Sequence, residues 1–401
     1  MKRRRRLGGG AILLEYLASD AGELAGRSTP APEPPVRVVP VSNTGPMITK
    51  PDRPPLSPGV DLPPFPEGWY FIAHRDSILR EKLIEKTWMG EEIVAWGDDQ
   101  GRICVADAFC PHLGSHLGPT VGGVVRDGCL VCPFHGFTFD STGRCVATPN
   151  ARAPSAARLK VYETREVLGM VFAWWGTAGR PPRWHLPEDP PTGPEWSAPR
   201  SCVLRFRGHP QETTENSVDV EHLAYTHGYS DVRPVGSTLV RGAYLKSCFD
   251  FKAVRKIAGL VDVVADVSAV THVHGLGYSL VEFHEKTIGM KSRLWVLAAP
   301  VDGTVVDLTL VSQVREIRKP GRFFVGFGFL PASLRHRLLN RIVLREERRF
   351  VLQDVVIWEK KRYQAPPRLS RADGPVGKYR QYSRQFYSEL EAERRPALSV
   401  V

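Results

Sequence analysis

Regular alternation of apolar and polar residues begins near residue 65 and continues, interrupted by turn signals, to about residue 178. Residues 91–110 contain two such runs on either side of a turn at Asp98–Gly101, and residues 169–176 form another short apolar run. Runs of this length that end at Gly or Asp are typical of β-strands. The pattern therefore predicts an all-β domain at 65–178, and the Pro- and Trp-rich stretch at 178–200 is expected to be a linker.

The pattern after residue 200 is different, because helix-like and strand-like segments are separated along the chain. A helix is expected at about 212–226, and a long amphipathic helix at about 332–363, with a break near residue 342 as an alternative. This order predicts an α+β domain at 179–401, in which helices pack on one side of an antiparallel sheet. Four strands with period-two alternation are expected between the helices, at 261–274, 277–285, 291–299 and 303–314.

A basic, proline-rich tail precedes the first strand. Positive charges at Lys2–Arg6 are followed by a short apolar stretch that Glu15 interrupts, and prolines are dense from 29 to 66. No small-residue cleavage site clearly follows, so a non-cleaved tail fits better than a secretory signal peptide, and a twin-arginine export signal is the alternative. Because proline-rich runs favour extended chain without a core, we expect residues 1–64 to be disordered, apart from a short helix that 11–26 could form.

Composition adds limits to this picture. The chain has 401 residues, 42% of them hydrophobic, which is enough for two cores. It contains no run of about 18 uncharged apolar residues, so no transmembrane segment is predicted. Its seven cysteines are an odd number without the spacing of a disulfide framework, which favours a cytoplasmic, reducing location.

The formal net charge of +11 is unevenly distributed. Residues 315–362 hold thirteen Lys and Arg against five Asp and Glu, a local excess of 13 − 5 = 8. A solvated helical surface explains most of this excess. The alternative is a docking face for an acidic protein, because a basic patch speeds encounter with anionic partners. Nucleic acid is not expected as a partner, since no aromatic interleaving or nucleic-acid motif accompanies the charge.

Two short loops in the all-β domain each contain one Cys and one His. Cys110-Pro-His112 and Cys132-Pro-Phe-His135 are separated by the nineteen residues 113–131. Two thiolates can hold one iron of a [2Fe–2S] cluster while two neutral imidazoles hold the other, which raises the reduction potential. A structural zinc site is the alternative, but such sites usually take both cysteines from one loop and both histidines from another. The spacing therefore predicts a [2Fe–2S] cluster on these four residues.

A second metal motif lies in the α+β domain. His222 and His227 follow Asp219, and non-haem iron oxygenases bind Fe(II) with two histidines and one carboxylate, leaving positions open for O2 and substrate. Residues five apart do not share a narrow helix face, so the helix must loosen near Tyr225–Gly228. Asp219 lies three residues before His222, so its carboxylate could hydrogen-bond a metal-bound histidine. Asp219 and Asn216, from the same motif, are the predicted catalytic residues.

The third iron ligand must come from elsewhere, and Asp354 is the best candidate. Val351, Ile357 and Trp358 lie at i−3, i+3 and i+4 from it, and are expected to share its helix face. A carboxylate among such residues is buried, which is costly unless it is paired or bound to a metal. An ion pair with a nearby arginine is the alternative, but the two-histidine motif favours the metal.

Other chemically active side chains have weaker signals. Cys129 lies where a strand should run and is expected to be a small buried residue, while His116 could approach the cluster without its spacing requiring this. His272 and His274 alternate on one strand and His284 lies on the next. They could line a substrate cavity, or they could be half-buried strand histidines.

At these motifs the chain resembles the α-subunits of Rieske non-haem iron oxygenases over about residues 65–390. It is most similar to the group that contains 3-ketosteroid 9-alpha-hydroxylase oxygenase components and cholesterol 7-desaturases. The first three motifs below are specific for the superfamily, and the last two indicate the steroid-like branch. The motifs are Pro66-Glu-Gly68-Trp69-Tyr70, the two Cys/His loops, Asn216-x-x-Asp219-x-x-His222-x4-His227, Gln353-Asp354-x-x-Ile357-Trp358-x-x-Lys361, and Asp373-Gly-Pro375 with Arg384-Gln-Phe386-Tyr387.

The resemblance implies a Rieske domain followed by a helix-grip (START-like) catalytic domain. It also implies a trimer, in which Asp219 bridges the cluster of one subunit and the iron of its neighbour, and electrons from NAD(P)H through a reductase, often with a ferredoxin. Two features depart from the family: the gap between the cluster loops is slightly long, and a basic tail stands where eukaryotic cholesterol desaturases have a membrane anchor.

The expected function is O2-dependent hydroxylation or desaturation of a bulky apolar, steroid-like or sterol-like substrate. Three alternatives stay open at this point. They are a natural-product tailoring oxygenase acting by oxidative cyclisation or amine oxidation, a Rieske electron carrier without oxygen chemistry, and a zinc-stabilised binding protein.

Overall fold

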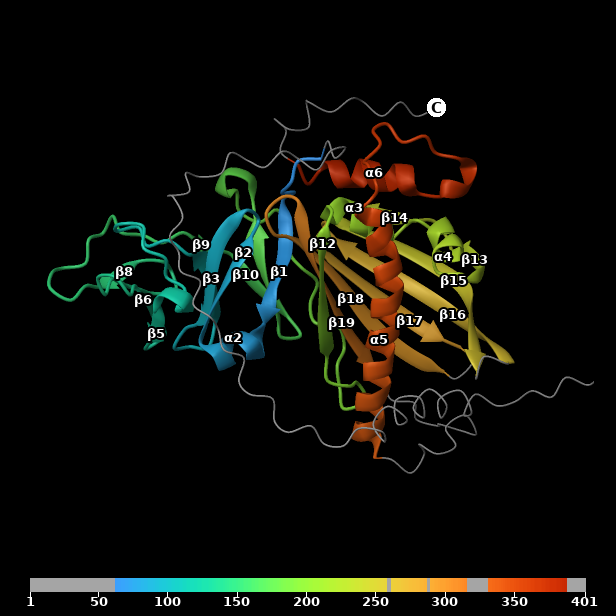
Figure 1. The fold of residues 1–401 in the computed structure, drawn as a ribbon, viewed down its shortest axis with the longest axis horizontal. Helices are drawn as coiled ribbons and strands as arrows, with labels where there is room; N and C mark the ends of the chain where they lie inside the picture. The colour runs from blue at the N-terminus through green and yellow to red at the C-terminus, as the bar shows by residue number, and fades with distance from the viewer. Residues whose placement is uncertain (1–61, 258–260, 287–288, 316–330, 388–401) are drawn as a thin grey trace, which may run out of the picture.

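A computed structural model describes residues 62–257, 261–286, 289–315 and 331–387. A smaller all-β part lies beside a larger part built around one broad antiparallel sheet (Figure 1). The predicted α+β class, with an all-β domain first, is therefore confirmed. Nearly all of the predicted tail, including the expected helix at 11–26, lies outside the described residues.

The all-β part consists of three antiparallel sheets, ordered β1-β11-β10, β2-β3-β4-β9 and β5-β6-β7-β8. The predicted strands on either side of the 98–101 turn are β3 and β4, and the predicted run at 169–176 is β11. The elements are β1 (Gly68–His74), α2 (Arg75–Glu81), β2 (Leu83–Trp88), β3 (Glu91–Gly97), β4 (Ile103–Asp107), η1 (Pro119–Val121), β5 (Val124–Arg126), β6 (Cys129–Val131), β7 (Thr138–Phe139), β8 (Cys145–Ala147), β9 (Val161–Tyr162), β10 (Thr164–Val167), β11 (Met170–Trp175) and η2 (Thr177–Gly179).

The larger sheet has the strand order β12-β19-β18-β17-β16-β15-β13, and β14 also pairs with β15. The four predicted strands are β16 to β19, whereas β12 to β15 were not predicted. β15 alternates regularly, and its charged residues Lys246, Asp250 and Lys252 stand at the outward positions. Among its buried positions the apolar series is interrupted at Ser247, which weakens the signal. The strands are β12 (Arg200–Arg207), β13 (Ser230–Pro234), β14 (Leu239–Arg241), β15 (Tyr244–Ile257), β16 (Val261–His274), β17 (Tyr278–Glu285), β18 (Met290–Pro300) and β19 (Val305–Val314).

The helices that accompany this sheet differ from the prediction in two respects. The long helix α5 is continuous, without a break near residue 342. The single helix predicted at 212–226 is wrong, because α3 and α4 are separate: Val218 packs with the core beneath α6, Val220 packs on β15 and β16, and a straight helix could not bury both. The elements are α3 (Pro210–Glu215), α4 (Glu221–Tyr225), α5 (Ala332–Trp358), η4 (Arg371–Asp373) and α6 (Val376–Arg384).

The two parts pack through one face of the large sheet. Trp69 and Phe172 of the all-β part share a core with Tyr278, Leu280 and Trp295 of β17 and β18. The opposite face of the sheet is turned toward α3, α4 and α5 (Figure 1). No helix within the described ranges is both long and apolar enough to cross a membrane.

Candidate metal centres

The two predicted cluster loops have the same backbone turn. The amide of the glycine four residues after each cysteine donates to that cysteine's carbonyl oxygen, Gly114 to Cys110 at 2.9 Å and Gly136 to Cys132 at 3.0 Å. The N–H of each cysteine donates to the carbonyl oxygen five residues further on, at 2.8 Å in both loops. The glycines have φ of 76° and 67°, which glycine adopts without a steric cost. The repeated Cys-Pro…Gly pattern therefore folds into two turns of one type.

The four predicted cluster ligands form two pairs. The thiols of Cys110 and Cys132 are buried, each 2% exposed, whereas the rings of His112 and His135 are exposed and have centroids 5.0 Å apart. Burial raises the pKa of the Cys110 thiol to about 11, so a bound cation is needed to ionise it at neutral pH. No three donors among the described residues of these loops lie within 4.8 Å of one another, as one zinc ion would require. The pairing fits a two-iron cluster instead.

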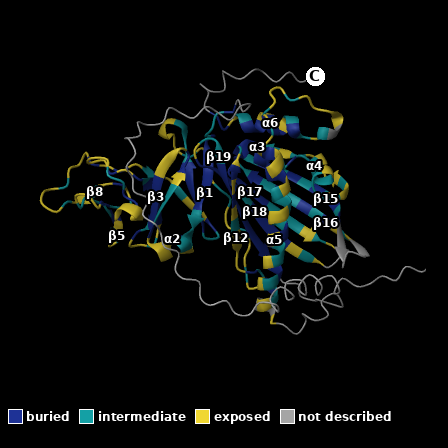
Figure 2. Cartoon of the chain, viewed as in Figure 1, coloured by how far each residue is buried: buried dark blue, intermediate teal, exposed yellow. Residues whose placement is uncertain are grey.

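The loops lie at the exposed end of the all-β part, where Figure 2 shows β5 and β8 surrounded by exposed chain. Leu113 and Phe134, next to the histidines, are 66% and 63% exposed. Both ring nitrogens of His116 have partners: Glu92 Oε2 lies 3.0 Å from its Nε2, and its Nδ1 accepts from the Gly118 amide at 3.0 Å. Cys129 is half-buried on β6, so the expected full burial is wrong.

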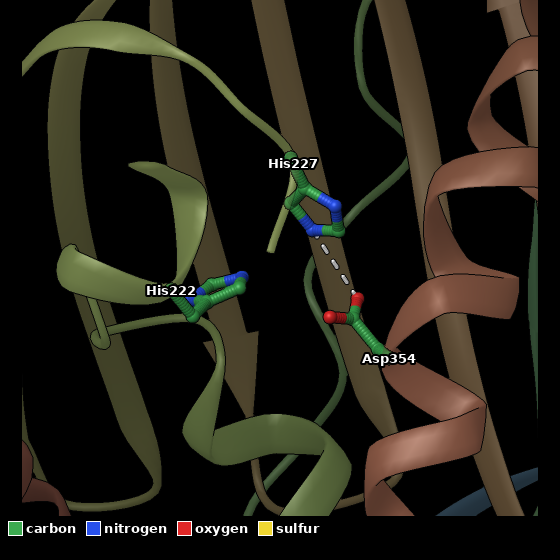
Figure 3. Close-up of side chains that lie close together, drawn as sticks. All are labelled: His222, His227 and Asp354. Atoms are coloured by element: carbon green, nitrogen blue, oxygen red, sulfur yellow. Dashed lines mark ion pairs between the residues drawn. The ribbon is translucent and has the colours of Figure 1, made fainter. Parts of the chain in front are cut away.

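The predicted iron ligands converge in the larger part. His222 lies on α4, His227 on the loop after it and Asp354 on α5, and their side chains point toward one another (Figure 3). One ligand atom from each lies within 4.8 Å of the others, and no other group of three or more His, Cys, Asp or Glu in the described chain does so. His227 Nε2 is 3.4 Å from Asp354 Oδ2. Two imidazoles and one carboxylate around a common point are the donor set of a non-haem iron centre.

The local chain course explains how histidines five residues apart can meet. Helix α4 ends at Tyr225, and the next residues turn at Gly228, whose φ is 70°. This confirms the predicted loosening of the helix. Asp354 is 7% exposed, so its carboxylate is buried as expected.

Each histidine is oriented by an acceptor that fixes its tautomer. His222 Nδ1 donates to the backbone carbonyl of Asp219 at 2.7 Å, and His227 Nδ1 donates to Gln353 Oε1 at 3.0 Å. Both acceptors are oxygens without a proton, so each neutral ring keeps the Nε2 lone pair for a metal. The expected ring contact of the Asp219 carboxylate is replaced by a backbone contact: its Oδ1 accepts from the His222 amide at 3.3 Å and lies 3.9 Å from Nδ1.

The two imidazoles differ in their affinity for protons. Burial lowers the pKa of His222, which favours the neutral form that binds metals. Burial also acts to lower the pKa of His227, but hydrogen bonds to Asp354 and Gln353 outweigh it and raise the pKa overall. Because Asp354 attracts a cation at this point, a metal ion can take the place of that proton.

The predicted surroundings of Asp354 are correct on one side only. Val351 and Trp358 line the same cavity as Asp354, whereas Ile357 is 48% exposed. On a helix, positions i−3 and i+4 lie about 40–60° to one side of residue i, and i+3 lies about 60° to the other side. The core is on the first side, so the expectation for Ile357 is wrong.

A cavity that opens to solvent adjoins the triad. Its volume, counted as the space open to the centre of a water molecule, is about 140 Å³, far more than the roughly 10–15 Å³ that one water needs. Aromatic and aliphatic side chains form most of its wall, and a smaller set of hydroxyl and amide groups and the side chain of Glu347 complete it. The wall includes Asn216, Leu223, Tyr229, Phe249, Phe251, Ala269, Thr271, Ser279, Val281, Phe283, Val296, Phe350, Val351 and Trp358.

The three strand histidines do not line this cavity. On β16 the cavity residues are Ala269 and Thr271, so His272 and His274 lie on the opposite face by the two-residue repeat of a strand. The same alternation on β17 places His284 outside. His272 Nδ1 lies 2.8 Å from the Tyr244 hydroxyl, and burial lowers the pKa of His274 to about 4. The half-buried alternative is confirmed for His272 and His274.

A buried charge network supports α3 and was missed in the sequence. The Arg380 guanidinium donates to Glu215 Oε1 at 2.8 Å, and Lys361 Nζ lies 3.1 Å from the same oxygen and 2.8 Å from Glu212 Oε2. The side chains of Glu215 and Arg380 are 7% and 5% exposed. The network joins α6 to the helix that leads into the cavity residue Asn216, although its members are far apart in sequence. The signal that the sequence offered was the pair of acidic residues Glu212 and Glu215 within the predicted helix at 212–226.

Comparison with known families supports both parts of the chain. Residues 68–163 match the Rieske [2Fe-2S] domain, and residues 173–387 match the 3-Ketosteroid 9alpha-hydroxylase C-terminal domain. The cholesterol 7-desaturase of Caenorhabditis elegans is 27% identical over 364 residues, covering 82% of this chain and 78% of the relative. The oxygenase component of 3-ketosteroid-9-alpha-monooxygenase from Rhodococcus rhodochrous is 26% identical over 359 residues, covering 84% and 87%.

Solved structures share the fold at lower identity. Dicamba monooxygenase bound to dicamba aligns with a TM-score of 0.56 and 16% identity, over 82% of this chain and 98% of that chain. NdmB of Pseudomonas putida CBB5 aligns with a TM-score of 0.59 and 15% identity, over 83% and 96%. Both alignments span the all-β part and the larger sheet together.

Proposed function

The chain belongs to the Rieske oxygenases with a catalytic domain of the 3-ketosteroid 9alpha-hydroxylase family, and we propose that it hydroxylates or desaturates a bulky apolar substrate of steroid or sterol type. The observation that carries this proposal is the convergence of His222, His227 and Asp354 beside a largely apolar cavity. Its relatives named as a cholesterol desaturase and a ketosteroid monooxygenase support the substrate class.

We propose that Cys110, His112, Cys132 and His135 hold the [2Fe–2S] cluster and that the triad holds Fe(II). When bound, the cluster supplies single electrons and Fe(II) supplies a position at which O2 is activated beside the substrate. The protein's own side chains hold the proposed ligands in position and shape the cavity beside them.

The residues around the triad would orient it and keep water out. The Asp219 carbonyl and Gln353 bind Nδ1 of His222 and His227, so that Nε2 of each ring is left for the metal. Phe350 packs against His227 with ring centroids 5.5 Å apart, and Trp358 closes the wall near Asp354. Asn216 lines the cavity with an amide that can hydrogen-bond a ligand, which suits the role proposed for it beside the metal.

Electrons would come from NAD(P)H through a reductase, with or without a ferredoxin. The exposed rings of His112 and His135, flanked by Leu113 and Phe134, form a surface suited to contact with another protein. We propose a homotrimer in which a neighbouring subunit meets this surface. Asp219, whose side chain is 32% exposed, would then lie between the two metal centres. None of the seven cysteines, all of which lie in the described residues, forms a disulfide, which supports a reducing, cytoplasmic location.

An iron count with product analysis tests the proposal. Three irons per chain are expected, and turnover of sterols, ketosteroids or polyketides with a reconstituted reductase should give a hydroxylated or dehydrogenated product. Labelled O2 separates these outcomes, because only hydroxylation leaves 18-oxygen in the product. Two irons per chain would instead indicate an electron carrier, and zinc without iron–sulfur absorbance would indicate a binding protein.

A matched pair of variants separates the two centres. His222→Ala should abolish turnover while the visible spectrum of the cluster stays intact, because the triad and the cluster loops are in different parts of the fold. Cys132→Ala should remove that spectrum. Loss of the spectrum in His222→Ala as well would contradict the assignment of two separate centres.

A further inference from the structure

The sheet wall of the cavity changes in polarity along its strands. Across β15, β16 and β17, Phe249 pairs with Ala269 and Ala269 pairs with Phe283, which makes one end apolar. Hydroxyl side chains face the cavity nearer the turn between β16 and β17. Thr271 lies two residues beyond Ala269 on β16, and Ser279 lies four residues before Phe283 on β17. The cavity therefore has an aromatic end and a hydroxyl-bearing end.

The hydroxyl groups at this end differ in their hydrogen bonds. Thr213 and Thr214, which line the cavity, donate to backbone carbonyl oxygens at 2.8 and 3.1 Å. Ser247, the β15 partner of Thr271, also donates to a backbone carbonyl oxygen, at 2.5 Å. Thr271 and Ser279 are only 2% and 4% exposed, and their hydroxyls have no hydrogen-bond partner among the residues that the structure describes. Both residues border the cavity, so a group bound there can supply the hydrogen bond that the protein does not.

We propose that Thr271 and Ser279 form a subsite that binds an oxygen-bearing group, a carbonyl or a hydroxyl, at one end of an otherwise apolar substrate. This inference rests on the proposed function and adds that the substrate must carry an oxygen-bearing group at one end. A hydroxyl both donates and accepts, so the pair fits either group. The aromatic side chains Phe249 and Phe283 then hold the hydrocarbon body. Because the oxygenated end can enter only one end of the cavity, the subsite selects which carbon faces the triad.

Binding to the holoenzyme without a reductase tests the subsite separately from turnover. The probes are two ligand pairs that differ only in oxygen, cholesterol with cholest-5-ene and cholest-4-en-3-one with cholest-4-ene, each measured by equilibrium dialysis. The wild type should prefer the oxygenated member of a pair. Thr271→Val and Ser279→Ala should each weaken that member about tenfold and leave the hydrocarbon unchanged, because each removes one hydrogen bond and little volume.

Two further variants distinguish recognition from packing. Thr271→Ser keeps the hydroxyl and should keep the preference. Val281→Ala, on the same wall and in register with Thr271, should weaken both members of a pair by the same factor. The inference is overturned if the wild type shows no preference in either pair, including the case in which nothing binds. It is also overturned if Thr271→Val weakens the hydrocarbon as much as its oxygenated partner. A failed iron count or absent turnover would contradict the proposed function without changing the binding preference.

Discussion

Replacing Gln353 by Ala removes the hydrogen-bond acceptor of His227 without touching the three proposed metal-binding atoms. Gln353 Oε1 accepts from His227 Nδ1 at 3.0 Å, and this contact keeps the Nε2 lone pair directed toward Asp354. Without the acceptor, the ring can rotate and can carry its proton on either nitrogen. We therefore expect weaker Fe(II) binding in Gln353→Ala, with the cluster unaffected.

The structure sets the size of this effect. A neutral hydrogen bond contributes about 0.5–1.5 kcal/mol net, and loss of a partner that orients a metal ligand typically costs about 10- to 100-fold in affinity. Gln353 is exposed, so water can partly replace it and the lower end applies. We expect a loss of about tenfold in Fe(II) affinity, which corresponds to about 1.4 kcal/mol. The free energy of unfolding of the metal-free protein should change by less than about 0.5 kcal/mol.

Anaerobic competition with a chromophoric Fe(II) chelator measures this affinity, and the visible absorbance of the cluster gives the concentration of intact protein. Gln353→Glu keeps an acceptor oxygen and should bind Fe(II) at least as well as the wild type. Val356→Ala, at a position 65% exposed on the same helix, is the matched control and should change nothing. Wild-type affinity in Gln353→Ala would refute the argument, as would a parallel loss of cluster absorbance.

Two further predictions concern stability. The pKa of His274 is lowered by burial from 6.5 to about 4, so between these values the unfolded chain binds a proton that the folded chain does not. Stability is then complete above pH 6.5 and falls by up to about 3 kcal/mol toward pH 4, and His274→Gln should flatten this slope in denaturant titrations at several pH values. Arg380→Met leaves Glu215 buried with Lys361 as its remaining cation, and should cost about 3 kcal/mol in urea unfolding. An unchanged midpoint would show that the ion pair does not hold α3.

Short-range signals in the sequence were sufficient to propose most of the metal ligands. Cys110 and His112 lie two residues apart, so their pairing can be read from a short stretch of sequence. The two-residue alternation that predicts β16 to β19 is equally local. The triad required one long-range step from His227 to Asp354. That step succeeded because a carboxylate among apolar helix residues needs a partner.

The parts that were not predicted depend on tertiary contacts. The division of α3 from α4 follows from Val218 and Val220 being buried in different cores, which no local pattern contains. The exposed position of Ile357 depends on which side of α5 meets the sheet. Likewise, the side of β16 that carries Thr271 rather than His272 into the cavity is set by the packing of the whole sheet.

That alternation separates two kinds of mutation. On β17, Ser279, Val281 and Phe283 face the cavity, whereas Tyr278 and Leu280 form the core shared with the all-β part. Neighbouring positions therefore have different roles. One set lines the cavity in which we propose that the substrate binds, and the other forms the core that joins the Rieske domain to the large sheet. Substrate range can change during evolution, or in a directed library, at every second position of a strand while the junction between the domains stays intact. A library confined to the cavity-facing positions should retain a far larger share of folded, cluster-containing variants than one spread over both faces.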